Sequence, residues 1–465
     1  MSVTFFNSCF CIEMSKKKCY NKKEFFNSER VLIMFVSENL SVNEKGNLAI
    51  NGHDTVDLAK KYGTPLYVMD EDMIRTHCRT YIDSINRFYD GKGMACFASK
   101  AFSCKEIYRV MQQEGMGIDV VSAGEIYTAY KAGFDMSKAV FHGNNKTEEE
   151  INMAADLGIG RIVADNVFEL DTLERIAKEK GKKFRVLLRI KPGVDAHTHS
   201  FISTGQIDSK FGFALETGEA FEAVKKTMSL ENLDFAGIHC HIGSSILDTQ
   251  GFVAAAEIMM KFIKQIKDET GFEIPELNLG GGFGIKYVEG DDPLPYDEYM
   301  KAVAEVVNSF CEKNDVKRPF ILIEPGRSVV GSAGITLYTC GGRKIIPNTR
   351  TYVSVDGGMC DNPRYILYQA EYDAVVANKA SLPKDEKVTI AGRCCETGDM
   401  IGENMPLQHC EPGDIIAVCA TGAYNYAMSS HYNRLRKPAV VFVNSSSDRI
   451  VVQRESLDDI IKNDI

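Results

Sequence analysis

The sequence lacks the features that mark a membrane, secreted or nucleic-acid-binding protein. Its longest apolar run near the start, Val31 to Val36, is far shorter than the roughly 20 residues that a bilayer-spanning helix needs. The first 33 residues are not ordered as a signal peptide, because their lysines follow Phe5 and Phe6 instead of preceding an apolar core. The formal net charge of −10 disfavours a nucleic-acid partner. We therefore expect a cytoplasmic protein that binds neither membrane nor nucleic acid.

Repeated CxxC spacing is also missing, which argues against a zinc site. The 14 cysteines are scattered along 465 residues, and Cys394 and Cys395 are adjacent. This distribution is typical of an intracellular protein with reduced thiols rather than of a disulfide scaffold. The chain is 44% hydrophobic and 25% charged, without a long low-complexity tract. A globular protein of this length is expected to form two domains.

Short β-rich runs alternate with amphipathic helical runs between about residues 92 and 326. Helical patterns such as Glu148–Leu157, Phe168–Lys180, Phe252–Glu269 and Tyr296–Cys311 separate most of the β runs. Eight consecutive units of this kind predict a (β/α)8 barrel, since a doubly wound sheet would rarely need so many. The predicted strands are Met94–Ser99, Gly117–Val121, Ala139–Gly143, Arg161–Asp165, Arg185–Ile190, Phe235–Ile242, Glu276–Gly281 and Ile321–Pro325.

Past residue 330, predicted strands follow one another without helices and indicate a mainly antiparallel β domain. Examples are Ile335–Thr339, Thr351–Val355, Lys387–Ala391, Asp414–Ala420 and Ala439–Val443. Leu40–Val68 is expected to add strands to this domain. We therefore predict a β domain formed by residues 34–68 and 318–455, and a barrel formed by 69–317 whose last strand runs to about 326. Residues 1–33 are expected to be a disordered or untranslated leader.

Polar residues gather at or just after the carboxyl ends of the predicted barrel strands. Because that face carries the chemistry in (β/α)8 barrels, we expect these residues to form one site. They are Lys100, Asp119, His142, Arg189, His241, Gly280–Gly282 and Glu324–Arg327.

Lys100 directly follows a predicted buried strand, so its amine could form an aldimine with a cofactor aldehyde at the barrel mouth. Considered alone, Phe97–Ala101 is better explained by a lysine that reaches into solvent. Leu279–Gly284 adds weight to the cofactor, because successive glycines let backbone N–H groups approach a phosphate. A tight turn is the alternative. No GxGxxG motif opens a helix after the first strand, so a nicotinamide cofactor is less favoured.

Glu324 is predicted to point into the barrel, where a carboxylate needs a cationic partner. A protonated ring nitrogen of a cofactor would serve, and an ion pair with Arg189 or Arg327 is the alternative. His239 and His241 alternate along one strand and could suggest a metal. No third ligand has a matching spacing, so we predict no metal and expect His241 to stack on a cofactor ring.

Ten motifs together carry a resemblance to a known family. Six are Phe97-Ala-Ser-Lys-Ala101, Asp119-Val-Val-Ser-Ala-Gly-Glu125, His142-Gly-Asn-Asn-Lys146, His241-Ile-Gly-Ser244, Gly280-Gly-Gly-Phe283 and Glu324-Pro-Gly-Arg327, in the order found in fold-type III pyridoxal-phosphate decarboxylases. Four more are Ala196–Gly205, Ser209–Gly212, Gly392–Asp399 and Thr421–Tyr424. Over residues 36 to 455 the chain resembles the diaminopimelate decarboxylases, which have the alanine-racemase-like fold.

The resemblance implies pyridoxal 5'-phosphate as the cofactor and assigns roles to matching residues. Lys100 would bind the cofactor covalently, Glu324 would pair with its ring nitrogen, and His241 would stack on its ring. Cys395 of a second subunit would protonate the reacting carbon, and Glu396 would bind the distal ammonium of the substrate. The phosphate would be held by Ser244, the backbone of Gly281 and Gly282, Gly326 and Tyr424. Substrate carboxylate would be bound by Arg327, Arg364 and Tyr368. Supporting roles would fall to Asp119, Glu125 and Arg189.

Several of these residues have simpler explanations. Cys395 could be a buried thiol, Tyr424 a core tyrosine, and Arg364 with Tyr368 a pair on a helix surface. Tyr365 follows Arg364 where many family members have proline.

The resemblance predicts decarboxylation of meso-2,6-diaminopimelate to L-lysine and carbon dioxide by a homodimer that shares its active sites between subunits. A decarboxylase of the same fold that acts on arginine, ornithine or carboxynorspermidine is one alternative. A non-catalytic cofactor-binding homologue is a second. An alanine racemase is disfavoured, because the pair Cys395 and Glu396 has no role there.

Overall fold

The computed structural model describes residues 35–194 and 209–465. The predicted leader, residues 1–33, and the motif Ala196–Gly205 lie outside these residues. Phe35–Ile465 form one compact unit. Within the described residues, no helix is long and apolar enough to cross a bilayer.

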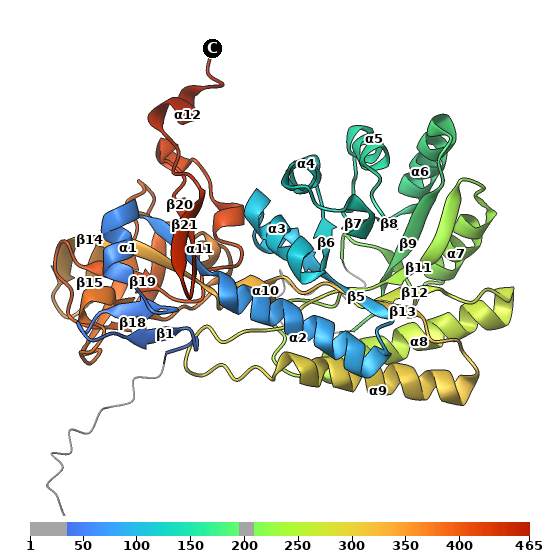
Figure 1. Cartoon of the computed structure of the whole chain (residues 1–465), viewed down its shortest axis with the longest axis horizontal. Helices are drawn as coiled ribbons and strands as arrows, with labels where there is room; N and C mark the ends of the chain where they lie inside the picture. The colour runs from blue at the N-terminus through green and yellow to red at the C-terminus, as the bar shows by residue number, and fades with distance from the viewer. Residues whose placement is uncertain (1–34, 195–208) are drawn as a thin grey trace, which may run out of the picture. The chain divides into compact units, whose positions relative to one another are not determined.

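Eight parallel strands form a closed barrel (Figure 1). Neighbouring strands follow the order β9-β11-β12-β13-β5-β6-β7-β8, and β8 pairs with β9 to close the ring. The strands are β5 (Gly93–Ala98), β6 (Gly117–Val120), β7 (Ala139–Phe141), β8 (Arg161–Ala164), β9 (Phe184–Lys191), β11 (Leu233–His239), β12 (Glu276–Asn278) and β13 (Phe320–Ile323). Each strand overlaps a predicted run, so the predicted barrel is confirmed. A further short strand, β10 (Phe213–Ala214), pairs with β9.

Helices cover the outside of the barrel. They are α2 (Glu71–Tyr89), α3 (Lys105–Glu114), α4 (Ala123–Ala132), α5 (Glu148–Leu157), α6 (Val167–Lys180), α7 (Glu219–Ser229), α8 (Gln250–Thr270) and α9 (Tyr296–Asn314). Helix α2 precedes the first barrel strand but packs against both α9 and α3 (Figure 1). It therefore takes the place of the helix that would otherwise follow β13.

Local sequence signals explain where these helices begin and end, as α5 illustrates. The hydroxyl of Thr147 accepts from the N–H of Glu150, and the Glu150 carboxylate accepts from the N–H of Thr147. This reciprocal capping satisfies backbone donors that a helix start leaves free. Gly158 ends the helix in the left-handed region, with φ of 73°. The helix matches the predicted range Glu148–Leu157.

Side chains fill the barrel interior below its carboxyl-terminal face. An apolar layer is formed by Cys96, Val140, Val163, Leu187, Ala236 and Leu322. Closer to the amino ends of the strands, Arg161 makes two hydrogen bonds of 2.7 Å to the carboxylate of Glu276. The barrel is therefore a packed core, and space for a ligand is left at the carboxyl ends of the strands.

A second, mainly antiparallel sheet forms the other domain. Its main path runs β18-β17-β15-β14-β4-β20-β21, and β19 pairs with both β14 and β16. Two pairs, β15 with β17 and β4 with β20, are parallel. The strands are β4 (Leu66–Asp70), β14 (Gly334–Ile346), β15 (Arg350–Val355), β16 (Ala374–Val376), β17 (Glu386–Ala391), β18 (Met400–Leu407), β19 (Ile415–Val418), β20 (Ala439–Asn444) and β21 (Ser447–Val452).

The segment ahead of the barrel contributes to this domain in two ways. Strand β4 lies inside the second sheet, between β14 and β20. Strands β1 (Leu40–Val42), β2 (Leu48–Ile50) and β3 (His53–Asp54) instead pair with one another, and their apolar side chains pack in a core shared with the second sheet. The boundaries given above for the two domains stay predictions.

Candidate functional site

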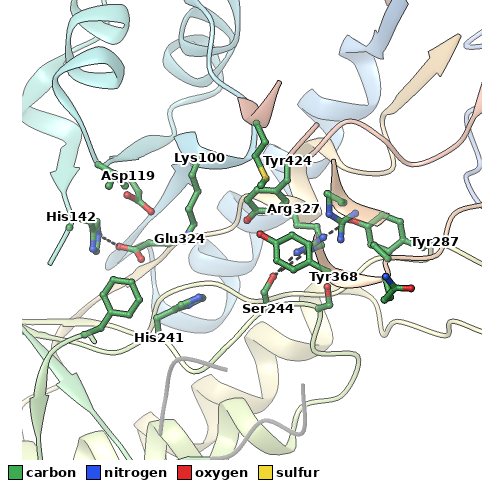
Figure 2. Close-up of a pocket in the computed structure, with 18 of the residues that line it drawn as sticks. Lys100, Asp119, His142, His241, Ser244, Tyr287, Glu324, Arg327, Tyr368 and Tyr424 are labelled. Atoms are coloured by element: carbon green, nitrogen blue, oxygen red, sulfur yellow. Dashed lines mark hydrogen bonds and ion pairs between the residues drawn. The ribbon is translucent and has the colours of Figure 1, made fainter. Parts of the chain in front are cut away.

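A cavity of about 600 Å³ lies at the carboxyl ends of the barrel strands (Figure 2). Its walls come from both the barrel and the second domain. Barrel residues include Lys100, Asp119, His142, Arg189, His239, His241, Ser244, Tyr287, Glu324 and Arg327, and the second domain adds Arg364, Tyr368 and Tyr424. The polar residues that the sequence placed at strand ends therefore meet in one site. Its volume suits a cofactor with a small substrate.

Lys100 extends into this cavity from the end of β5 (Figure 2). The strand stops at Ala98, and Ser99–Ala101 form a single turn of 3₁₀ helix that turns the chain at the barrel mouth. The carbonyl of Ala101 accepts a hydrogen bond of 2.8 Å from the N–H of Tyr424, which joins this turn to the second domain. The turn that carries Lys100 is therefore bonded to the backbone of Tyr424, and both residues line the cavity.

The carboxylate of Glu324 is buried and is surrounded by nitrogen donors. Its Oε1 lies 2.6 Å from Nε2 of His142 and accepts at 2.6 Å from the amide of Asn278, and its Oε2 lies 3.2 Å from Nε2 of His239. Burial would raise the pKa of Glu324, but the two imidazoles outweigh burial and hold the pKa well below its usual range. Glu324 is therefore ionised at neutral pH.

His239 is buried beside Glu324 and is neutral. Burial lowers the pKa of His239 to about 4, against the opposing effect of Glu324. A neutral ring that donates from Nε2 to Glu324 carries no proton on Nδ1, and Nδ1 has no hydrogen-bond partner among the described residues. His142, His239 and Glu324 also have a spacing that could hold a metal ion. Nε2 of His142 and Nε2 of His239 already hydrogen-bond to the carboxylate of Glu324.

The glycine turn after β12 is packed too closely for side chains. A Cβ on Gly281 would lie 2.0 Å from the carbonyl oxygen of Glu324, and one on Gly282 would lie 2.6 Å from that of Gly243. Oδ1 of Asn278 accepts from the N–H of Gly280 at 2.9 Å, so the same amide side chain contacts this turn and Glu324. The packing therefore requires glycine at both positions.

A recess of about 50 Å³ opens beside this turn. The residues around it include Lys100, His241, Ser244, Gly281, Gly282, Gly326 and Tyr424. This set contains every residue that the sequence analysis assigned to phosphate binding, together with Lys100. The hydroxyl of Ser244 accepts two hydrogen bonds from the guanidinium of Arg327, at 2.8 and 3.3 Å.

Two arginines, Arg327 and Arg364, also line the cavity, and Figure 2 shows Arg327 on the side away from Glu324. Arg327 donates to the hydroxyl of Tyr287 at 2.5 Å, and its guanidinium carbon lies 4.8 Å from the ring centre of Tyr424. Arg364 begins the short helix α11 (Arg364–Tyr368), is buried, and donates to the hydroxyl of Tyr372 at 2.6 Å. Arg364 and Tyr368 do share a helix, but both line the cavity instead of forming a surface pair.

His241 and Arg189 also reach the cavity. The N–H of Gly281 donates to Nδ1 of His241 at 3.3 Å, which leaves the proton of a neutral ring on Nε2. Burial, together with the charges of Lys100 and Arg189, lowers the pKa of His241 well below its usual range. The guanidinium of Arg189 lies 4.1 Å from the ring centre of Phe211 and 4.0 Å from a carboxylate oxygen of Asp165. Glu324 therefore contacts two histidines. The alternative from the sequence, an ion pair of Glu324 with Arg189 or Arg327, is not formed among the described residues.

The two acidic residues predicted to support the site differ in position. Asp119 lines the cavity, and its Oδ1 has no hydrogen-bond partner among the described residues. Glu125 is not among the cavity residues; its carboxylate accepts from the N–H of Val121 at 2.7 Å. Burial and the nearby charge of Asp119 raise the pKa of Glu125 to about 7.

Cys395 and Glu396 are exposed and do not line the cavity of their own chain. They lie in the loop between β17 and β18, which is held by the buried carboxylate of Asp399. That carboxylate accepts from the N–H groups of Met359 and Cys394, each at 2.6 Å. These hydrogen bonds fix the base of the loop, and Cys395 is exposed on it.

The sequence analysis gave no role to four residues that shape this site. His142, His239 and Asn278 surround Glu324, and Tyr287 contacts Arg327. His142 and His239 did stand out in the sequence, in a motif and in the strand considered for a metal. Asn278 was missed because the predicted strand ran from Glu276 to Gly281, whereas the observed strand ends at Asn278. Tyr287 lies in a loop and belongs to no motif of the sequence.

Known proteins are similar to this chain in sequence and in fold. Residues 71–331 match the family described as pyridoxal-dependent decarboxylase, pyridoxal binding domain. The chain is 49% identical over 424 residues to the diaminopimelate decarboxylase of Bacillus methanolicus, covering 91% of this chain and 98% of that protein. It is 47% identical over 434 residues to the enzyme of the same name from Bacillus subtilis strain 168, with 93% and 98% covered.

A solved structure gives the same result. The crystal structure of diaminopimelate decarboxylase from M. jannaschii in complex with L-lysine is similar, with a TM-score of 0.85 and 35% identity, covering 93% of this chain and 99% of that one. The family match spans more than half of the described chain, and the relatives align over nearly their whole lengths. This chain belongs to the diaminopimelate decarboxylase family of pyridoxal-dependent decarboxylases.

Proposed function

We propose that the protein decarboxylates meso-2,6-diaminopimelate to L-lysine and carbon dioxide, the last step of lysine biosynthesis. One observation carries this proposal: a single cavity joins Lys100 and an ionised Glu324 to two arginines. Neither Arg327 nor Arg364 forms an ion pair with a carboxylate among the described residues. A substrate that brings its own distal carboxylate would supply the missing negative charge.

Pyridoxal 5'-phosphate is the cofactor of this family, and the cavity is suited to it. The glycine turn admits no side chains, as the close contacts of a Cβ at Gly281 and Gly282 demonstrate, so backbone and Ser244 can approach a phosphate. Lys100 is within the same recess and would bind the aldehyde. Oε2 of Glu324 has one hydrogen bond, to His239, and a second lone pair for the N–H of the ring.

The bound cofactor supplies an electron sink for the electron pair left behind when carbon dioxide departs. Glu324 would keep a proton on the ring nitrogen, because His142 and His239 keep the carboxylate ionised despite burial. His241, neutral under the same conditions, would give a flat uncharged face for the ring. Asp119 has an unpaired carboxylate oxygen that faces Lys100 across the cavity (Figure 2).

Arg327, Arg364 and Tyr368 would orient the substrate by its distal carboxylate. A planar guanidinium can bind a carboxylate through two parallel hydrogen bonds, which a single ammonium cannot do. Ornithine has no distal carboxylate, so it would leave the guanidinium groups unpaired and should be a poor substrate. Glu396 would complete recognition by pairing with the distal ammonium.

The remaining residues would come from a second subunit of a homodimer. Cys395 and Glu396 are exposed on a braced loop outside the cavity of their own chain, which is the arrangement needed to serve a neighbour. In a two-fold dimer each subunit would lend this loop to the other, giving two equivalent sites. Cys395 would then return a proton to the carbon that has lost carbon dioxide. A cytoplasmic location and the lack of a nucleic-acid partner stay predictions from the sequence.

Carbon dioxide release tests this proposal. Purified protein with pyridoxal 5'-phosphate would be given meso-diaminopimelate, L-ornithine, L-arginine or carboxynorspermidine, with Lys100→Ala as the control. We expect turnover of diaminopimelate alone, abolished in the control. Turnover of another amine instead would overturn the roles given to Arg364 and Glu396. No turnover of any of the four by a protein that has bound the cofactor would favour a non-catalytic homologue.

A further inference from the structure

Tyr287 is the one residue whose ring and hydroxyl together contact both arginines of the cavity, within the described part of the chain. We propose that Tyr287 is a positioning residue that sets Arg327 and Arg364 for the distal carboxylate of the substrate, and so determines specificity for it. This inference rests on the proposed function. Tyr287 acts through the arginines and takes no part in the chemical step.

Hydrogen bonds within the loop fix the backbone of Tyr287. After β12 and the glycine turn, the N–H groups of Tyr287 and Val288 donate to one carboxylate oxygen of Asp291, at 2.9 and 3.1 Å. The side chain of Tyr287 is buried, and its ring packs edge-on against Tyr372, with ring centres 5.5 Å apart. Both its backbone and its ring are therefore fixed before a ligand binds.

Tyr287 contacts the two arginines in different ways. Its hydroxyl accepts from Arg327 at 2.5 Å. The guanidinium carbon of Arg364 lies 4.9 Å from its ring centre, so the π face of the same ring attracts the second cation. Arg327 follows the last barrel strand, β13, and Arg364 begins α11 in the second domain, so one tyrosine contacts cations from two separate segments of the chain.

A tyrosine suits this position because it attracts cations without neutralising them. Two guanidinium groups near one another repel, and a carboxylate between them would cancel their charge. That carboxylate would also compete with the substrate for the same hydrogen-bond donors. A phenol accepts a hydrogen bond and offers a π face, yet leaves both positive charges available. Consistent with this, the guanidinium groups lower the pKa of Tyr287 even though burial raises it.

Tyr372 provides a matched control. Its hydroxyl accepts from Arg364 at 2.6 Å and from the amide of Asn425 at 3.4 Å, and no contact with Arg327 is described for it. Removing either hydroxyl deletes one oxygen from a buried tyrosine in the same cluster. The substitution Tyr287→Phe loses the hydrogen bond to Arg327, whereas Tyr372→Phe leaves Arg327 untouched and loses the hydrogen bonds to Arg364 and Asn425.

The test compares ligands with and without the distal carboxylate. L-lysine keeps that carboxylate after decarboxylation, whereas cadaverine lacks it. In the holoenzyme with Tyr287→Phe, we expect the KM for meso-diaminopimelate and the Kd for L-lysine to rise about tenfold, equivalent to about 1.4 kcal/mol. The kcat and the Kd for cadaverine should stay within about twofold. Tyr372→Phe should raise the same KM by about threefold or less.

Calorimetry gives both Kd values without turnover, and their ratio does not depend on the fraction of folded protein. An unchanged ratio of L-lysine to cadaverine affinity in Tyr287→Phe would overturn the inference. Equal weakening of both ligands gives that unchanged ratio and indicates a general structural role. Wild-type holoenzyme that fails to decarboxylate diaminopimelate would instead contradict the proposed function, while the two Kd values would still decide the role of Tyr287.

Discussion

The two ends of the cavity solve opposite electrostatic problems. At the acid end, formed by Glu324 with His142, His239 and Asn278, a buried anion has all its nearby partners in place. At the arginine end, formed by Arg327 and Arg364 with Tyr287 and Tyr372, two cations contact phenols and no carboxylate among the described residues. The charged group of the first end already has hydrogen-bond donors around it, whereas the cations of the second have no anion among the described residues until a ligand binds.

This difference indicates which end does chemistry and which selects substrate. An ionised group that is fixed in a buried place needs no rearrangement when charge develops nearby, which is the arrangement that favours catalysis. Cations that keep their charge attract an anion strongly, because burial in a protein weakens the screening by water. Substitutions at the acid end should therefore lower kcat, and those at the arginine end should raise KM.

Glu324→Gln should have the largest effect. The amide keeps the size of the side chain but loses the charge that would hold a proton on the ring nitrogen of the cofactor, so kcat should fall by about 10²–10³-fold. Steady-state rates with saturating meso-diaminopimelate measure this fall. Glu125→Gln, outside the cavity, is the control and should stay within about threefold. A kcat for Glu324→Gln within tenfold of wild type would contradict the catalytic role given to the acid end.

Arg364→Met should act mainly on binding, with a loss of about 100-fold in kcat/KM for meso-diaminopimelate that lies mostly in KM. Arg364→Lys retains the charge but not the planar fork, so its loss should be nearer tenfold. Progress curves across a range of substrate concentrations separate the two constants. A fall in kcat with KM unchanged would assign Arg364 to the chemical step and contradict the division between the two ends.

His142→Gln should weaken the acid end without dismantling it, because His239 and Asn278 still contact Glu324. Burial raises the pKa of Glu324 and His142 lowers it, so removal of the imidazole should raise that pKa. The activity of the variant should then be lost at a higher pH than wild-type activity as the solution is acidified. Profiles of kcat from about pH 5 to pH 8 measure the shift, with kcat at neutral pH down by roughly tenfold. If the acid limb of the kcat profile does not shift, His142 does not control the pKa of Glu324.

The smallest effect is expected on the alkaline side of the KM profile. Arg327 and Arg364 lower the pKa of Tyr287 against the opposing effect of burial, so its phenolate forms at a lower pH than that of an ordinary tyrosine. The phenolate would compete with the distal carboxylate, so KM should rise about threefold before the pH reaches the range in which an ordinary tyrosine ionises. Tyr287→Phe has no proton to lose and should lack this rise. The same rise in both proteins would point to another titrating group.

The barrel and the location of its site could be predicted because their signals are local. Each buried strand is a short apolar run, and the polar residues at the strand ends meet by the geometry of the fold. In the second domain, β16, β18 and β21 were not predicted. Strand β18 contains Pro406, and β21 begins with polar and charged residues, so both have weak strand signals.

The pairing inside the site could not be predicted, because it depends on contacts between distant parts of the chain. His142 and Glu324 are 182 residues apart, and nothing in either neighbourhood states that one faces the other. The alternatives considered for Glu324 were arginines, since charge alone favours them as partners. The structure uses imidazoles instead, which keep the carboxylate ionised and leave the arginines available for a ligand.

The exposed position of Cys395 on its loop also gives a way to measure how tightly two subunits associate. Among the described cysteines Cys395 alone is exposed, Cys311 is partly covered, and the others are buried. A thiol-reactive dye should therefore label Cys395 first in an isolated subunit, since access controls the rate. If a partner covers this loop, the labelling rate will fall as protein concentration rises. The concentration at which the rate is halved would then report the dissociation constant of the dimer, in an experiment that requires neither substrate nor catalysis.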